Sequence, residues 1–276
     1  MRIMNQSRFS SRPIVALMTD FGLGDGDVGV MKGVIAGIIP EVHIIDLTHD
    51  VAPQNVPSGA WILASAYRYF PPGTVFVCVV DPGVGSSRGA IAVYAGDWYF
   101  VGPDNGLFSY IYAEQAVHQA VELNNASYHL SQVSSTFHGR DIFAPAGAHL
   151  AGGSVLNELG TELDPAALHK LDSAQPTRYG AKLAAHIVHV DNFGNLITSI
   201  PLSMVSELFT CSRVDIQFPT TQAVVDRRRR FFADGPDDGQ PFIYGDSSGY
   251  VAIAVRNGNA AKTLNVGLGE PLLLSQ

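Results

Sequence analysis

In the first part of the chain, short apolar runs alternate with segments whose apolar residues recur at helical spacing. Residues 13–19, 42–48 and 73–78 are apolar, partly β-branched runs that predict strands. Residues 28–39 and 56–70 show helical spacing and each segment ends at a proline, so both predict helices. Strands that alternate with helices predict an α/β domain with a mostly parallel sheet, covered on both faces.

The pattern changes along the second part of the chain. Residues 90–94 and 98–101 predict a hairpin, and the small residues of 144–151 predict a helix. From residue 182 onward the sequence predicts short strands with little helix, which is typical of a small β-barrel or sandwich. The predicted strands are 182–190, 196–200, 213–218, 241–245, 250–255 and 262–266.

These patterns predict two domains. We expect a disordered N-terminus at 1–12, an α/β domain at 13–165, a linker at 166–182 and a β-barrel domain at 183–276. The apolar content of 46% favours compact domains with a large core.

Charge and cysteine usage narrow the class of protein. The net charge of −8 argues against a nucleic acid or an anionic membrane as partner. The basic run at 227–230 is an exception, and such runs are usually solvated loops. Cys78 and Cys211 form neither a disulfide framework nor a metal-binding pattern, and no apolar run is long enough to span a membrane. We therefore expect a cytoplasmic protein.

The densest polar chemistry follows the strand predicted at 73–78. Asp81 ends this strand, a Pro-Gly-Val-Gly turn follows, and Arg88 lies seven positions beyond Asp81, where it can fold back. Because ligands bind at the carboxyl ends of strands in open α/β sheets, this stretch is a candidate site. The alternative is that Asp81 only stabilises a glycine-rich turn.

Two further clusters are predicted at the same edge of the sheet. Asp20 ends the first strand, and His138, Arg140 and Asp141 precede the helix predicted at 144–151. Any one of these side chains could be a helix cap or a structural imidazole. Three clusters on one edge favour a pocket that orders a polar ligand.

A metal site is an alternative interpretation of these polar residues. His49, Asp50, His138 and Asp141 are possible ligands, but their spacing matches neither a His-Glu-x-x-His helix nor a Cys/His zinc site. Residues 25–27 lack the spacing of a calcium-binding EF-hand loop.

Two polar turns lie between strands of the predicted β domain. Residues 190–195 and 245–249 carry groups that suit an amino-acid or nucleoside ligand, although each could be an ordinary hairpin turn. Phe231 and Phe232 are either core residues or an aromatic face for a flat base.

Seven of these stretches, taken in order, resemble the S-adenosyl-L-methionine hydroxide adenosyltransferases, relatives of the fluorinase and the chlorinase. The resemblance extends from about residue 13 to the C-terminus. It is carried by Thr19-Asp-Phe-Gly22, Met31-Lys-Gly33, Val79-Val-Asp-Pro-Gly-Val-Gly85 with Arg88, Gly102-Pro-Asp-Asn-Gly106, Phe137-His-Gly-Arg-Asp141, Asp191-Asn-Phe-Gly-Asn195 and Ser247-Ser-Gly-Tyr250.

The resemblance implies a metal-independent hydrolase that converts S-adenosyl-L-methionine to adenosine and L-methionine without a cofactor. It also implies a Rossmann-like N-terminal domain, a C-terminal β-barrel, and a homotrimer with the site at the subunit interface. The family's catalytic set maps onto Asp81, Arg88 and His138. Halogenating relatives carry Tyr where Asp81 stands, and the fluorinase carries Ser where Gly139 stands, which favours water as the nucleophile.

The resemblance also assigns the substrate contacts. Asp20 corresponds to the ribose partner, Asp191 and Ser247 lie near the methionine, and Asn195 lies near the adenine. Phe232 stands where an aromatic residue stacks on the base, and residues 252–257, which include Asn257, line the adenine pocket. The roles of Asp27 and of the arginines at 227–230 stay open.

The chemistry of the catalytic set is consistent with hydrolysis. A sulfonium is already a good leaving group, so the site needs only a water or hydroxide held in line behind C5′ of the ribose. Either Asp81 or His138 can take its proton, and the sequence does not decide between them. The rival functions are a chlorinase and a non-catalytic S-adenosyl-L-methionine or adenosine-binding protein.

Overall fold

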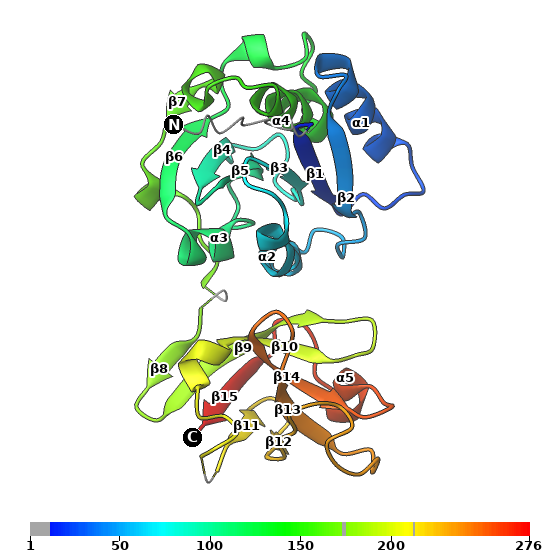
Figure 1. The fold of residues 1–276 in the computed structure, drawn as a ribbon, viewed down its shortest axis with the longest axis vertical. Coiled ribbons are helices and arrows are strands. Elements are labelled where there is room, and N and C mark those ends of the chain that lie inside the picture. Colours follow the sequence, from blue (N-terminus) through cyan, green and yellow to red (C-terminus); the bar gives the residue numbers. More distant parts are fainter. Residues whose placement is uncertain (1–11, 173–174, 212) are drawn as a thin grey trace, which may run out of the picture. The chain divides into compact units, whose positions relative to one another are not determined.

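The computed structural model describes residues 12–172, 175–211 and 213–276. The disordered N-terminus predicted at 1–12 therefore lies outside the described residues except for Arg12. The chain forms two compact units, Met1–Lys170 and Leu171–Gln276, which we call the N-terminal unit and the C-terminal unit (Figure 1).

The N-terminal unit is built on a seven-stranded sheet with the strand order β2-β1-β3-β5-β4-β6-β7. Its strands are β1 (Ile14–Thr19), β2 (His43–Thr48), β3 (Val75–Val79), β4 (Ala90–Ala95), β5 (Trp98–Pro103), β6 (Val117–Glu122) and β7 (Thr161–Glu162). The pairs that join β2, β1, β3 and β5 are parallel, whereas those that join β5, β4, β6 and β7 are antiparallel.

The sheet is thus mixed, and the expected mostly parallel sheet is not what the structure has. The predicted hairpin is confirmed, because a two-residue turn with Gly96 at φ +56° reverses the chain between β4 and β5. Its return strand, β5, lies beside β3, and β6 then adds to the other edge of β4. The sequence pattern did not predict β6, so two of the three antiparallel pairings, β4 with β6 and β6 with β7, were missed.

Helices cover both faces of this sheet (Figure 1). Helix α1 (Asp27–Ile38) packs beside α4 (Ala144–Ala151), and α2 (Val56–Ala66) packs beside α3 (Ser109–Glu114). Short helical turns complete the unit: η1 (Tyr67–Tyr69), η2 (Ala126–Tyr128), the π-helix η3 (Gly139–Phe143), η4 (Leu156–Leu159) and η5 (Pro165–Ala167).

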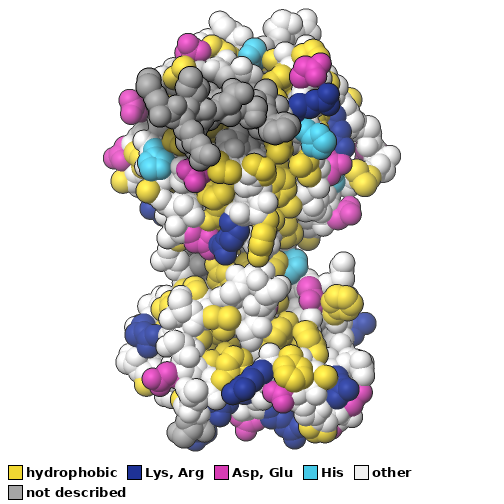
Figure 2. All heavy atoms as spheres, in the orientation of Figure 1, with side chains coloured by type: hydrophobic (Ala, Val, Ile, Leu, Met, Phe, Trp, Pro, Cys, Tyr) yellow, Lys and Arg dark blue, Asp and Glu magenta, His cyan; other side chains and the backbone are white. Residues whose placement is uncertain are grey.

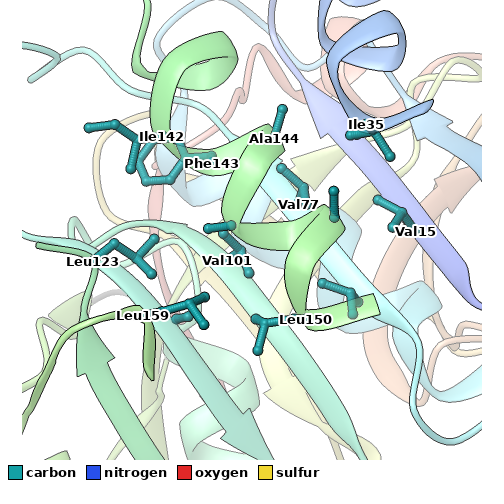
Figure 3. Close-up of a cluster of buried hydrophobic side chains, with 14 of the residues drawn as sticks. Val15, Ile35, Val77, Val101, Leu123, Ile142, Phe143, Ala144, Leu150 and Leu159 are labelled. Carbon is teal, nitrogen blue, oxygen red and sulfur yellow. The ribbon is translucent and has the colours of Figure 1, made fainter. Parts of the chain in front are cut away.

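Strand β3 lies at the centre of the core and is buried on both faces, which explains its continuous apolar sequence. Val77 belongs to the cluster between α4 and the sheet, together with Val15 and Val101 from the sheet and Leu150 from α4 (Figure 3). Helix α4 approaches β3 closely because Gly147 has no side chain: a Cβ there would lie 2.3 Å from Cγ2 of Val77.

The C-terminal unit is an antiparallel, nearly closed barrel-like sheet with the order β12-β11-β15-β9-β10-β14-β13, to which β8 adds beside β9. A bridge between Arg228 and Ile243 brings the segment after β12 against β13 and nearly closes the barrel. The elements are β8 (Thr177–Tyr179), β9 (Lys182–Val190), β10 (Leu196–Pro201), η7 (Leu202–Val205), β11 (Asp215–Phe218), β12 (Ala223–Val225), β13 (Pro241–Gly245), β14 (Tyr250–Val255), α5 (Ala260–Leu264) and β15 (Pro271–Ser275).

The strand predicted at 262–266 is wrong, because this segment belongs largely to helix α5. The Asn259 side chain accepts a hydrogen bond from the backbone N–H of Lys262 and caps the N-terminus of the helix. Asn265 ends the helix in the left-handed conformation, with φ +52°. Strands β12 and β15 were not predicted.

Within the described residues, no helix is long and apolar enough to cross a membrane. Cys78 and Cys211 are both free thiols, and burial raises the pKa of the Cys78 thiol.

We predict that Gly147→Ala destabilises the N-terminal unit by about 1–3 kcal/mol, because its Cβ would force α4 away from Val77. The matched control is Gly37→Ala, also within a helix, where a Cβ meets nothing within 4 Å. That substitution should stabilise the protein by up to about 1 kcal/mol, because alanine favours helix. Urea unfolding measures both, and equal midpoints for the two variants would contradict the packing argument.

Candidate active site

The carboxyl ends of β1 and β3 bring two carboxylates to one edge of the sheet. The two strands are parallel neighbours, and Thr19 at the end of β1 pairs with Val79 at the end of β3. Asp20 and Asp81 follow these two strands, so the register places both at the edge where ligands bind in such sheets.

At this edge, Asp81, Arg88 and His138 form one connected cluster. Arg88 donates from Nε to both carboxylate oxygens of Asp81 at 3.0 Å and from Nη2 to Oδ2 at 2.5 Å. The same Nη2 lies 2.8 Å from Nδ1 of His138. The side chains of Asp81 and Arg88 are only 5% and 10% exposed, so this ion pair is poorly screened by solvent.

The turn after β3 gives Arg88 its direction. Ser86 donates its backbone N–H to the carbonyl of Gly83, and its hydroxyl accepts from the backbone N–H of Arg88 at 3.3 Å. Gly85 has φ +78°, and a Cβ there would lie 2.3 Å from the carbonyl oxygen of Ser135. Glycine is therefore required for the turn to lie against the segment that leads to His138.

The π-helix Gly139–Phe143 follows His138 directly and sets its position. Asp141, in this π-helix, is fully buried and accepts from Arg140 at 2.6 and 3.0 Å and from the backbone N–H of Ser134 at 2.8 Å. These hydrogen bonds outweigh the desolvation from burial and lower the pKa of Asp141. The predicted cluster thus divides: His138 joins Arg88, while Arg140 and Asp141 hold the loop.

The contact with Arg88 selects one tautomer of His138. A guanidinium N–H can only donate, so Nδ1 of His138 accepts and the proton of the neutral ring lies on Nε2. Burial, then the positive charge of Arg88, lower the pKa of His138 below its ordinary 6.5, against the opposing charges of Asp81 and Asp141. His138 is therefore neutral and offers an Nε2–H donor.

Asp20 is held by the loop that connects β2 to α2. Its Oδ2 accepts from the backbone N–H of Gln54 at 2.7 Å. Behind it, Nδ1 of buried His49 lies 2.8 Å from the hydroxyl of Thr19, and Nε2 of His49 lies 3.1 Å from Oδ1 of Asp46. His49, a possible metal ligand from the sequence, thus supports the end of β1 instead.

Within the described residues, no group of three or more His, Cys, Asp or Glu side chains is placed to hold a metal ion. Asp27 begins helix α1, and its charge acts on Arg140.

In the C-terminal unit, the two polar turns predicted from the sequence have the same internal hydrogen bonding. Asp191 Oδ1 accepts from the backbone N–H of Asn195 at 2.8 Å, and Asp246 Oδ1 accepts from that of Tyr250 at 2.8 Å. Asp191 Oδ2 also accepts from the side-chain amide of Asn195 at 2.7 Å. Both carboxylates therefore build hairpin turns, while Ser247 is exposed at the second turn.

Sequence reasoning missed Tyr244, which connects the two turns electrostatically. Burial, followed by the carboxylates of Asp246 and Asp191, raises the pKa of Tyr244, so both carboxylates act on this phenol. An aromatic residue within a predicted strand indicates a core position, so the sequence gave no reason to assign Tyr244 to the site. Burial also raises the pKa of Asp246.

Beside the first of these turns, residues 191–195, lies a cavity of about 450 Å³. It is lined by Phe193, Asn195, Phe232, Ala233, Val255, Arg256, Asn257 and Gly258. The structure thus brings together Asn195, Phe232 and Asn257, three residues predicted from separate stretches. Phe193 is 76% exposed at the tip of its turn and was not predicted to contribute. The cavity combines flat aromatic walls with a few polar groups, as sites for flat heterocycles do.

Comparison with known proteins places the chain among characterised relatives. Two family models match it: the SAM hydroxide adenosyltransferase N-terminal domain at residues 15–160 and the C-terminal domain of the same family at residues 185–273. The chain is 41% identical over 266 residues to an (R)-S-adenosyl-L-methionine hydrolase of Salinispora arenicola, covering 95% of this chain and 98% of that one.

A more distant relative and a solved structure also match most of the chain. A fluorinase of Actinoplanes sp. is 29% identical over 278 residues, covering 89% of this chain and 91% of that protein. The crystal structure of an uncharacterized conserved protein from Thermotoga maritima superimposes with a TM-score of 0.86 at 36% identity, covering 95% of this chain and all of that one.

We predict that Arg88→Met raises the pKa of His138, because a positive charge is removed while Asp81 remains. NMR titration of the His138 ring measures the shift. Arg68→Met, which removes an arginine paired with Glu114 instead, should leave the pKa of His138 unchanged.

In the wild type, His138 binds a proton less readily in the folded protein than in the unfolded chain. Its contribution to stability is therefore complete above the ordinary pKa of 6.5 and decreases as the pH falls below it. A wild-type His138 pKa above 6.5 would contradict this geometry.

Proposed function

This chain belongs to the SAM hydroxide adenosyltransferase family, and from that premise we propose that it hydrolyses S-adenosyl-L-methionine to adenosine and L-methionine. The observation that carries the proposal is the contact of Arg88 with both Asp81 and His138 at the end of β3. One guanidinium thus holds a carboxylate and a neutral imidazole in fixed orientations, which suits the positioning of a water molecule.

The reaction needs little from the protein except a well-placed nucleophile. The C5′–O bond forms as the C5′–S bond breaks, the bonding electrons pass to sulfur, and the water loses one proton. Because the neutral sulfur of methionine leaves without protonation, no general acid is required. Holding the reactants in line can supply roughly 7–11 kcal/mol in well-oriented systems.

The tautomer of His138 divides the work between the two candidate bases. Its Nδ1 is engaged by Arg88, so the ring cannot accept a proton from water while that contact lasts. We therefore assign His138 Nε2–H to holding the nucleophile's oxygen and Asp81 to accepting its proton. Oδ1 of Asp81 receives one hydrogen bond from Arg88, at 3.0 Å, and keeps capacity for a water.

The substrate contacts follow from the two groups of residues. Asp20 is proposed to accept hydrogen bonds from the ribose hydroxyls, and Gly139 is proposed to contact the substrate. The adenine is proposed to occupy the cavity of Asn195, Phe232 and Asn257, with Phe232 against its face. Asp191 and Ser247 are proposed to lie near the amino-acid end of the substrate.

We further propose that the protein is a cytoplasmic homotrimer in which the N-terminal unit of one copy and the C-terminal unit of another complete each site. The family resemblance supports this assembly. The proposed reaction uses no metal ion and no cofactor.

We predict that purified, EDTA-treated protein converts S-adenosyl-L-methionine to adenosine and L-methionine. The reaction is run with and without chloride, and its products are separated by chromatography. Asp81→Asn should lower kcat by about 10²- to 10⁴-fold, because the amide cannot accept the proton. Asp97→Asn, which removes an exposed carboxylate at the β4–β5 turn, should leave kcat unchanged.

Other outcomes of this assay separate the rivals. A 5′-chloro-5′-deoxyadenosine product that requires chloride would move the protein to the halogenases. Tight adenosine binding without any product would make it a binding protein. Equal kcat for the wild type and Asp81→Asn would remove Asp81 from the mechanism.

The shared site predicts complementation between two inactive variants. Asp81→Asn has an intact C-terminal cavity, and Phe232→Asp, which puts a charge against the adenine, has an intact N-terminal cluster. Coexpressed in equal amounts, they should recover about a quarter of the wild-type activity, because each site draws its two halves independently. Recovery of no activity would show that each site is built from one copy.

A further inference from the structure

Arg229 is buried in the C-terminal unit, although the arginine run at 227–230 was interpreted as a solvated loop. Arg229 is 4% exposed, and its guanidinium carbon lies 4.4 Å from the centre of the Phe242 ring. Its Nη2 donates to the carbonyl of Pro236 at 2.7 Å and its Nη1 to that of Phe232 at 3.4 Å. A buried arginine with such contacts is a structural centre and not a free charge.

The backbone around Arg229 explains why it turns inward. Its N–H donates to the carbonyl of Ile243 at 3.0 Å, as in a strand beside β13, so successive side chains face opposite sides. Arg228 therefore points the other way and donates to the carbonyls of Leu208 and Cys211. In Figure 2, Lys and Arg side chains lie among hydrophobic ones on the viewed face of the C-terminal unit.

The partners of Arg229 are the two ends of an exposed loop, residues 231–238, which we call the cavity loop. This loop carries Phe232 and Ala233, two of the residues that line the cavity. Its backbone crosses close to the guanidinium at Gly235, where φ is +124° and a Cβ would lie 3.2 Å from Nε of Arg229. Phe232 also packs against the rings of Phe242 and Tyr244, with centroid distances of 6.0 and 5.1 Å, so Arg229 and these rings together fix the shape of the loop.

Two other residues that line the cavity, Arg256 and Asn257, also form hydrogen bonds to the cavity loop. Arg256 Nη1 donates to the carbonyl of Gly235 at 2.9 Å, and the Asn257 side-chain amide donates to Asp237 Oδ2 at 2.6 Å. Arg256 and Asn257 themselves line the cavity. A displacement of the loop would therefore alter both walls at once.

We propose that Arg229 is a positioning residue for nucleoside recognition, which fixes the cavity loop so that Phe232 stands ready against the base. This inference rests on the proposed function, because it takes the adenosine moiety as the occupant of the cavity. Arg229 acts through Phe232 and the loop, at a part of the substrate that does not react. Its loss should weaken binding of the ground state and the transition state equally.

The neighbouring ion pair contributes less to the loop than Arg229 does. Arg227 donates to Asp238 Oδ2 at 2.5 Å and lowers the pKa of that carboxyl, but their side chains are 50% and 32% exposed. Exposed pairs of this kind add little to stability. The buried contacts of Arg229 with Phe242 and Pro236 therefore hold the loop more firmly than this exposed pair does, and they act together with the contacts of Arg256 and Asn257.

The test is Arg229→Met in the full-length protein, which keeps an apolar stem and removes every donor. We expect the KM for S-adenosyl-L-methionine to rise about tenfold or more while kcat changes less than about threefold. The Kd for adenosine, measured by calorimetry, should rise by the same factor. Arg229→Lys keeps the charge without the planar fork, so its KM should lie between those of Arg229→Met and the wild type.

Arg230→Met is the matched control. Arg230 is exposed, and within the described residues only its backbone N–H is hydrogen-bonded, to Asp234 Oδ2 at 3.0 Å. This variant should retain the wild-type KM and Kd. Equal KM values for Arg229→Met and Arg230→Met, or a fall in kcat with unchanged KM, would overturn the proposal.

A second pair of variants keeps the proposal testable if Arg229→Met does not fold. Gly235→Ala should raise the KM and the Kd for adenosine, because its Cβ pushes the loop away from Arg229. Gly239→Ala, also at positive φ but with nothing within 4 Å of its Cβ, should not. Wild-type affinity in Gly235→Ala would contradict the role of the contact.

The two measurements separate this inference from the proposed function. If the wild type shows turnover but all these variants match it in KM and Kd, the inference fails and the hydrolase assignment stands. If the wild type binds adenosine without turnover, the hydrolase assignment fails, and the Kd values still decide the role of Arg229. If the wild type neither converts S-adenosyl-L-methionine nor binds adenosine, both fail.

Discussion

The double contact of Arg88 is the interaction on which the candidate site depends. Asp81 follows a buried strand, Arg88 follows a glycine turn, and His138, fifty residues after Arg88, precedes a π-helix. One planar guanidinium satisfies the carboxylate and the imidazole together, and in doing so it fixes the tautomer of His138. Without it, the two side chains that we propose to act on one water would have no common orientation.

The surroundings of this contact show why it can be held firmly. Gly85 allows the turn after β3 to lie against the carbonyl of Ser135. The buried Asp141 accepts from the backbone N–H of Ser134 and so fixes the segment that contains Ser135. The sheet beneath is buried on both faces at β3, so the end of that strand has little freedom. A rigid strand end with a reactive group in the following loop is how α/β proteins generally place chemistry.

The C-terminal unit solves a different problem, namely how to hold a wall of an open cavity. Its two Asp-led turns are stabilised by their own side chains and need no further support. The cavity loop has short backbone hydrogen bonds of its own, and it is also held from outside by Arg229, Arg256 and Asn257. Arginine suits that task, because its planar fork can stack on a ring and donate to several carbonyls at once.

The sequence by itself predicted most of the elements and singled out the residues of the candidate site. The apolar run that became β3 needs burial on both faces, and Asp81, Arg88 and His138 stand out as polar groups at element ends. What it did not determine depends on pairing and burial, which no local pattern encodes. The antiparallel half of the N-terminal sheet followed from where β5 and β6 paired, and α5 formed because Asn259 and Asn265 capped it. Arg229 became a buried support, and not a solvated charge, only because the nearly closed barrel placed Phe242 beneath it and the loop above it.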